Sequence, residues 1–65
     1  MKKQPTQFNI FKHFSEQAAK LERQGKYIDA NLAWRDASRN AIKEGDRLWC
    51  DNRAQFCLRM VKKPF

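Results

Sequence analysis

Residues 21–37 read LERQGKYIDANLAWRDA, and this stretch decides the fold of the 65-residue chain. After Gly25, small and aromatic residues recur at intervals of three and four: Tyr27, Ala30, Trp34 and Ala37. That spacing places them on one face of an α-helix. The alanines leave room that the aromatic rings fill, a pattern typical of closely packed antiparallel helices. The stretch therefore predicts the end of one helix, a glycine turn and a second helix.

The residues before the turn predict an amphipathic helix over about residues 9–24, with Asn9 as its N-cap. Its apolar face is Phe11, Phe14, Ala18 and Leu21, and its polar face is Glu16, Lys20, Glu22, Arg23 and Lys26. Gly25 supplies the positive φ that a helix C-terminus commonly needs. We expect the second helix over about residues 26–44, with Gly45 closing it.

A third helix is expected over about residues 46–62, with Asp46 as its N-cap. Two adjacent rows along it form a broad buried arc: Trp49, Arg53, Phe56, Met60 and Cys50, Ala54, Cys57, Val61. Arg53 is expected at the edge of the arc, with its guanidinium in water. No segment alternates polar and apolar residues as a strand does. The prediction is an all-α, three-helix domain over residues 9–65, a helical hairpin capped by a third helix, behind a flexible basic tail at 1–8.

The expected structural core combines these rows: Phe14, Ala18, Leu21, Tyr27, Ala30, Trp34, Ala37, Trp49, Phe56, Cys57 and Met60. Ile28 and Leu32 fall beside the packed stripe of the second helix. They either widen the core face or stay exposed as a contact for a partner. Apolar residues off the packed rows, with two arginines at their rim, are the candidate partner-binding residues: Ile28, Leu32, Arg35, Arg39, Leu48 and Leu58.

A domain of this size is barely stable alone, because apolar burial and a chain entropy of roughly 1.5 kcal/mol per ordered residue nearly cancel. Cys50 and Cys57 lie seven residues apart in one expected helix. Their Cα atoms would be about 10.5 Å apart, beyond the reach of a disulfide. No apolar run has the length of a signal peptide or a membrane span. We expect a reduced, cytoplasmic protein that gains stability by association, as a homodimer.

The net charge of +7 is compatible with binding to nucleic acid, to an anionic membrane or to an acidic protein. The basic residues do not segregate opposite one apolar face, which argues against a membrane surface. Helices two and three could form a helix-turn-helix that exposes four polar residues to DNA: Arg47, Asn52, Gln55 and Arg59. Three carboxylates close to where phosphates would lie argue against it: Glu44, Asp46 and Asp51.

Little in the sequence indicates catalysis. The single histidine, His13, lies between Phe11 and Phe14 and is expected to be solvated or packed at an edge. Two thiolates two helical turns apart cannot both approach one zinc ion to about 2.3 Å. Neither a nucleophile–base grouping nor a glycine-rich phosphate loop is recognisable. We expect a protein that is not an enzyme and that binds neither a metal ion nor a cofactor.

The spacing from Gly25 to Ala37, with Ala18 as the small residue of the first helix, resembles the turn and second helix of a tetratricopeptide repeat. A single hairpin of this kind cannot bury its own face, so the third helix would act as its cap. The resemblance implies a tetratricopeptide-like scaffold that binds protein.

A second resemblance covers about residues 11–59. The blocks AAKLERQGKY (18–27) and NRAQFCLR (52–59) are similar to the AraC-negative-regulator family, small bacterial proteins related to the PerC-like regulators. This resemblance implies a repressor of virulence-type genes, an anti-activator that binds an AraC/XylS-type transcription activator and blocks its dimerisation or DNA contact. It also implies a link to nucleoid-associated silencing proteins. The alternative is a direct DNA-binding regulator that uses the third helix as recognition helix.

Overall fold

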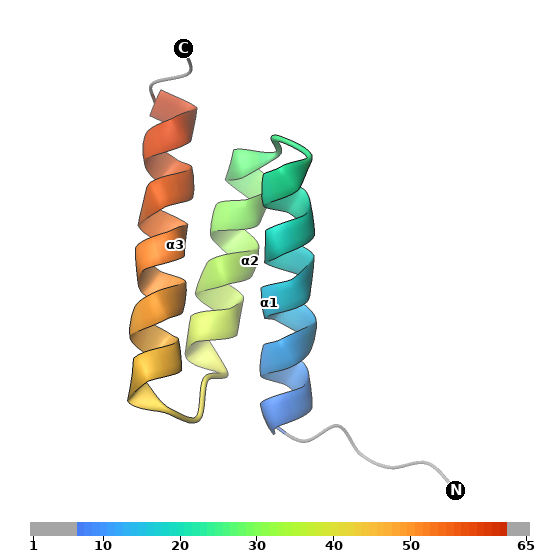
Figure 1. The fold of residues 1–65 in the computed structure, drawn as a ribbon, viewed down its shortest axis with the longest axis vertical. Helices are drawn as coiled ribbons and strands as arrows, with labels where there is room; N and C mark the ends of the chain where they lie inside the picture. The colour runs from blue at the N-terminus through green and yellow to red at the C-terminus, as the bar shows by residue number, and fades with distance from the viewer. Residues whose placement is uncertain (1–6, 63–65) are drawn as a thin grey trace, which may run out of the picture.

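The computed structural model describes residues 7–62, which form three α-helices: α1 (Gln7–Arg23), α2 (Tyr27–Arg39) and α3 (Glu44–Lys62). The helices lie side by side with α2 in the middle, and α1 and α3 both run antiparallel to it (Figure 1). Each outer helix packs on α2, while α1 and α3 touch each other only weakly. The predicted all-α, three-helix domain is confirmed, with α1 and α2 as a hairpin and α3 against its second helix.

Gly25 makes the turn between α1 and α2, as predicted, and has a φ of 77°. The N–H of Lys26 donates to the carbonyl of Leu21 at 2.9 Å, and the N–H of Gly25 donates to that of Glu22 at 3.0 Å. These two bonds form a Schellman motif, which satisfies the last carbonyls of α1. A Cβ at Gly25 would meet no atom within 4 Å. The turn therefore requires glycine for its left-handed backbone and not for space.

The start of α1 differs from the prediction. The helix begins at Gln7, so Asn9 lies inside it and is not the N-cap. Between Pro5 and Asn9 the sequence has no glycine or proline that would stop a helix from starting early. Of the tail predicted at residues 1–8, Gln7 and Phe8 belong to α1, and residues 1–6 lie outside the described part of the chain.

The end of α2 also differs, because the helix stops at Arg39, well before the predicted Glu44. Asn40 is the reason. Its backbone N–H donates to the carbonyl of Ala37 at 3.1 Å. Its side-chain Nδ2 donates to the carbonyl of Asp36 at 2.9 Å. These bonds satisfy carbonyls of the last turn and end the helix.

The start of α3 is correspondingly earlier than predicted. The helix begins at Glu44, so Gly45 does not close α2 and Asp46 does not cap α3; both lie in the first turn of α3. The φ of Gly45 is not positive, which lets it continue a helix. The carboxylates of Glu44 and Asp46 lie where the N-terminal end of the helix dipole stabilises negative charge. The predicted end at Lys62 agrees with the structure.

The core is built mainly from small side chains. Its buried apolar members are Ala18, Ala30, Ala33, Trp34, Ala37, Ala41, Cys50, Ala54 and Cys57. Among them Trp34, 2% exposed, is the only large one. Other predicted core residues are half-buried around this cluster: Phe14, Leu21, Tyr27, Phe56 and Met60. Small residues let the helices approach closely, so most of the large rings lie at the margin of the contacts.

Trp49 is not a core residue, contrary to the prediction, because its side chain is 51% exposed. The small row of α3, with Cys50, Ala54 and Cys57, faces α2 and is buried. Trp49 precedes Cys50 by one residue and is therefore turned about 100° away around the helix. In addition, the side-chain Nδ2 of Asn31 on α2 donates to the carbonyl of Ala54 at 2.6 Å and holds α3 in this rotation.

Candidate functional site

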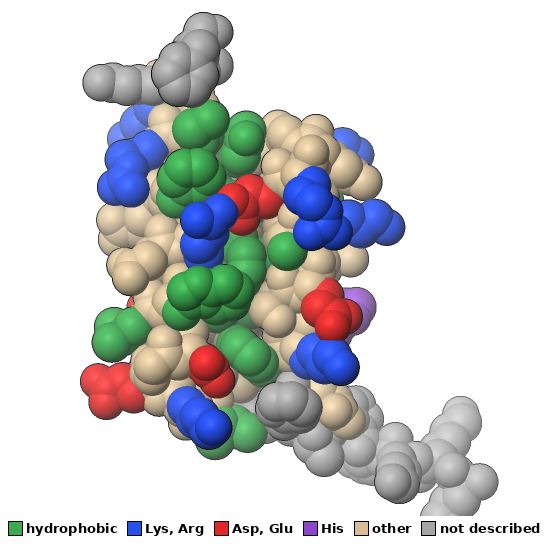
Figure 2. All heavy atoms as spheres, viewed as in Figure 1, with side chains coloured by type: hydrophobic (Ala, Val, Ile, Leu, Met, Phe, Trp, Pro, Cys, Tyr) green, Lys and Arg blue, Asp and Glu red, His purple; other side chains and the backbone are tan. Residues whose placement is uncertain are grey.

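One face of the three-helix layer has a groove between α1 and α3, and α2 forms its floor. Figure 2 looks onto this face, where apolar side chains gather along the middle with acidic and basic side chains among them. The groove has a volume of about 410 Å³ and is lined by Ala19, Glu22, Arg23, Tyr27, Trp34, Trp49, Arg53 and Phe56. We call it the aromatic groove. Beyond Tyr27, a second hollow of about 550 Å³ extends between the α1–α2 turn and Met60.

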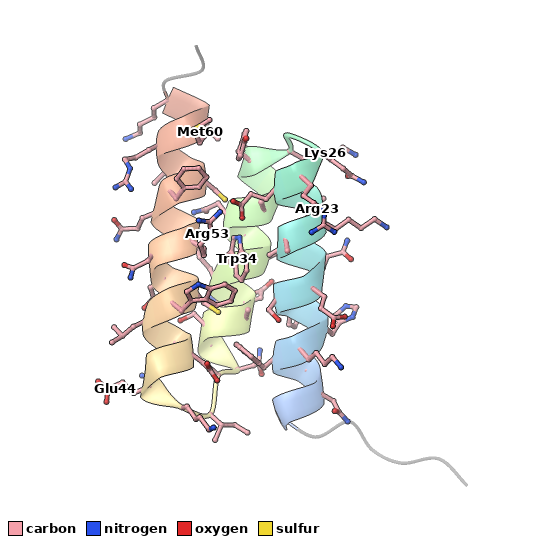
Figure 3. The ribbon with its side chains drawn as sticks, in the orientation of Figure 1. Arg23, Lys26, Trp34, Glu44, Arg53 and Met60 are labelled. Atoms are coloured by element: carbon pink, nitrogen blue, oxygen red, sulfur yellow. The ribbon has the colours of Figure 1, made fainter. Side chains whose placement is uncertain are left out.

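Glu22 joins all three helices inside the aromatic groove. Its Oε1 accepts a hydrogen bond from Trp34 Nε1 at 2.9 Å, and its Oε2 accepts one from Arg53 Nη2. The Glu22 side chain is only 14% exposed. Figure 3 shows Trp34 and Arg53 close together in the middle of this face. Glu22, which the sequence places on the polar face of the first helix, therefore has a largely buried carboxylate that connects α1 to α2 and α3.

The rings of the groove meet edge to face. The centroids of Trp34 and Trp49 are 4.9 Å apart at an interplanar angle of 84°. Those of Tyr27 and Phe56 are 6.5 Å apart at 80°. The guanidinium carbon of Arg53 lies 4.6 Å from the Phe56 ring centroid, a cation–π contact. Arg53 does lie at the edge of the buried arc, as predicted, but its charged end is held by a carboxylate and a ring instead of water alone.

None of the six predicted partner-binding residues lines this groove, and all six are exposed. Leu32 is turned about 160° around α2 from Trp34, so it faces away from the aromatic groove. With exposures of 62% for Ile28 and 55% for Leu32, these two side chains do not widen the core. The structure therefore excludes a wider core face and shows both side chains exposed.

The structure brings some of these six residues together and separates others. Arg35 and Leu58 line one hollow of about 310 Å³ between α2 and α3. Ile28 lines the hollow at the α1–α2 turn. Leu48 is turned about 160° from Cys50 and points away from α2. Sequence reasoning missed Ile42, which is 63% exposed between α2 and α3, although its position off every packed row was a usable signal.

The two cysteines are free and fully buried. Burial raises the pKa of Cys50 from 9.0 to about 11, and the nearby carboxylates of Asp46 and Asp51 act in the same direction. Burial also raises the pKa of Cys57, and Arg53 offsets part of that rise. Both thiols are therefore protonated near neutral pH, and neither is an activated nucleophile.

We expect the native protein to react slowly with iodoacetamide at about pH 8, where a two-unit rise in pKa lowers the thiolate fraction of Cys50 about 100-fold. Burial adds a barrier to access. Mass spectrometry of timed samples, with the chain in concentrated urea as control, measures both rates. Equal rates in the native and unfolded chains would contradict the burial of these thiols.

Other chemistry has little support in the described part of the chain. The exposed His13 packs edge-on against Phe14, with ring centroids 5.3 Å apart. Within residues 7–62, no three His, Cys, Asp or Glu side chains form a group that could hold a metal ion. None of the helices described here combines the length and the apolar character needed to cross a membrane.

Comparison with known proteins gives one relative. No family model matches the chain, and no solved structure matches it. Over 58 residues the chain is 38% identical to an uncharacterized protein in the Mu-like prophage FluMu region of Haemophilus influenzae. The match covers 89% of this chain and 78% of that protein. The chain therefore belongs to the same family as this Mu-like prophage protein.

Proposed function

We propose that this protein is a cytoplasmic negative regulator of transcription that binds an AraC/XylS-type activator and blocks its dimerisation or its contact with DNA. The observation that carries the proposal is the group of large apolar side chains exposed on α2 and α3, with Leu32 at 55% and Leu58 at 46%. Exposed apolar side chains on one face commonly form protein-binding sites. The blocks AAKLERQGKY and NRAQFCLR, which resemble the AraC-negative-regulator family, supply the class of partner.

The proposed contact surface has an apolar centre and a charged rim, as protein interfaces commonly have. Leu32 and Leu58 would supply apolar contact, and Arg35, which shares a hollow with Leu58, would lie at the rim. Arg39 lies one helical turn further along α2 and already pairs with Asp36. The proposal also includes self-association as a homodimer and an indirect connection to nucleoid-associated silencing proteins. It assigns no catalytic step to the chain.

Direct DNA binding is the alternative, and its support is the exposed polar side of α3: Arg47, Asn52, Gln55 and Arg59. However, α2 and α3 lie antiparallel along their lengths (Figure 1). The two helices of a helix-turn-helix instead cross at roughly 90–120°. This packing favours protein binding over insertion of α3 into a DNA groove.

We expect Leu32→Asp and Ile28→Asp each to weaken binding to an AraC/XylS-type activator about tenfold or more, because each buries a charge in an apolar contact. Titration of purified activator by fluorescence anisotropy measures the affinity, and a promoter–reporter assay measures repression. Ile42→Asp is the matched control, since Ile42 is equally large and 63% exposed but lies outside the proposed surface.

Two outcomes would count against this assignment. If Leu32→Asp and Ile28→Asp leave both binding and repression intact, the partner does not use this surface. If the protein prefers one promoter sequence without any activator, and this affinity falls steeply with salt, the DNA-binding alternative is correct.

A further inference from the structure

We propose that the aromatic groove is a second docking site, which takes an amphipathic α-helix of a partner protein that carries carboxylates beside its apolar stripe. The groove lies on the opposite side of α2 from Leu32. This inference therefore goes beyond the proposed function and does not depend on which activator, if any, contacts Leu32.

The shape of the site fits a helix. Along α3, four groove-side residues follow one another at helical spacing: Trp49, Arg53, Phe56 and Met60. None of them is fully buried, and Trp49 is 51% exposed. The facing wall is α1, through Ala19 and Arg23, and the floor is α2, through Trp34. Two parallel outer helices beside a central one leave a linear groove, in which the Glu22–Arg53 pair lies between aromatic rings. Amphipathic helices are commonly bound in grooves between helices.

The polar atoms at the centre of the groove are already paired, which argues against a small polar ligand. Trp34 Nε1 and Arg53 both donate to Glu22. Among the described residues, no buried side-chain nitrogen or oxygen lacks a hydrogen-bond partner. What the groove offers is therefore apolar ring surface and a neutralised ion pair. Such a surface binds apolar side chains.

The rim of the groove is basic at one end. α1 and α3 finish at the same end of the layer (Figure 1). Of the basic residues in the last turn of α1, Arg23 lines the groove. Figure 3 shows Arg23 and Lys26 at this end, and Lys26 lines the adjoining hollow. Because Arg53 neutralises Glu22, the two lining cations Arg23 and Lys26 outnumber Asp29, the carboxylate that lines the same hollow as Lys26. They complement carboxylates of a bound helix. A second copy, with the same net charge of +7, would bring like charges together.

The test uses two synthetic helical peptides that share a leucine stripe and carry only Glu or only Lys on the polar face. Trp49 is the exposed one of the two tryptophans, so a helix covering it shifts its fluorescence to shorter wavelength. We expect the Glu peptide to bind saturably and the Lys peptide at least tenfold more weakly. Because Trp49→Ala removes this reporter, affinities of the wild type and all variants are measured by the anisotropy of a labelled peptide. Trp49→Ala should lower the affinity for the Glu peptide at least tenfold. The matched control is the neighbouring Leu48→Ala, whose wild-type side chain is 54% exposed and faces away from the groove.

Arg23→Glu removes a rim cation without touching the core, so it keeps the test valid even if Trp49→Ala loses structure by circular dichroism. It should also lower the affinity for the Glu peptide, and added salt should weaken the wild-type complex. Leu32→Asp should bind the peptide as wild type does, which separates this site from the surface proposed for the activator. The inference is overturned if neither peptide binds, or if the Glu and Lys peptides bind equally well. It is also overturned if neither Trp49→Ala nor Arg23→Glu changes the affinity. Sedimentation in which Trp49→Ala converts a dimer into monomers would instead identify a second copy as the occupant.

Discussion

Trp34→Ala is expected to unfold most of the domain, with a loss of roughly 3–5 kcal/mol. A core of this size rarely contributes more than about 3–5 kcal/mol of net stability, so the loss is comparable to the whole. Trp34 is the only large side chain among the buried apolar residues, and the alanines and cysteines around it are too small to fill the space it leaves. The substitution also removes the donor to Glu22 Oε1. Urea titration followed by circular dichroism measures the change.

Trp49→Ala is the matched control, because it deletes the same side chain from a position that is 51% exposed. We expect a loss of about 1 kcal/mol, mostly from the edge-to-face contact with Trp34 and the half of the ring that is buried. Trp34→Phe keeps a ring but removes the N–H. Its loss of stability should lie between those of Trp34→Ala and Trp49→Ala. Equal losses for the two alanine variants would mean that both tryptophans belong to the core, as the sequence alone predicts.

Glu22→Ala is expected to lower the free energy of unfolding by about 2 kcal/mol. It leaves the indole N–H of Trp34 and the guanidinium of Arg53 without their acceptor. Breaking a fully buried pair typically costs more, but Arg53 is 37% exposed and water will screen part of the loss. For a domain of this size, about 2 kcal/mol corresponds to a fall in melting temperature of about 10 °C.

A second carboxylate of α1 provides the comparison. Glu16 pairs with Lys12 at 4.0 Å, and both side chains are largely exposed. Glu16→Ala should therefore change stability by no more than about 0.5 kcal/mol. Glu22→Gln, which keeps an acceptor for Trp34 but loses the charge opposite Arg53, should be intermediate. If Glu22→Ala is as mild as Glu16→Ala, the connection between α1 and α3 contributes little to the fold.

The thinness of the molecule explains how it could have two binding surfaces. Because α1 and α3 flank α2 and touch each other only weakly, the layer has two broad faces, and each can meet a separate partner (Figure 1). One face has the aromatic groove, and Leu32 lies on the other side of α2. The peptide and activator titrations test these faces independently. Substitution of Trp49 should affect only peptide binding, and substitution of Leu32 only activator binding.

Much of the fold follows from local periodicity. Intervals of three and four residues predict all three helices, and Gly25 predicts the turn, because a helix C-terminus of this kind needs a left-handed residue. Helix ends were less predictable. Gly45 and Asp46 are common at helix ends, yet Asn40 stops α2 earlier through its backbone and side-chain hydrogen bonds. Several competing end signals lie within a few residues, and the sequence does not rank them.

The site depended on tertiary structure for two physical reasons. Trp34 and Trp49 look alike in the sequence, and the rotation of α3 decides between them: the small Cys50 row permits close approach to α2, which turns Trp49 outward. Glu22 looks like any carboxylate on a polar helix face. It becomes a connecting residue only because folding brings to it Trp34, 12 residues away, and Arg53, 31 residues away. Periodicity describes one helix at a time, and a groove between helices arises only when they pack.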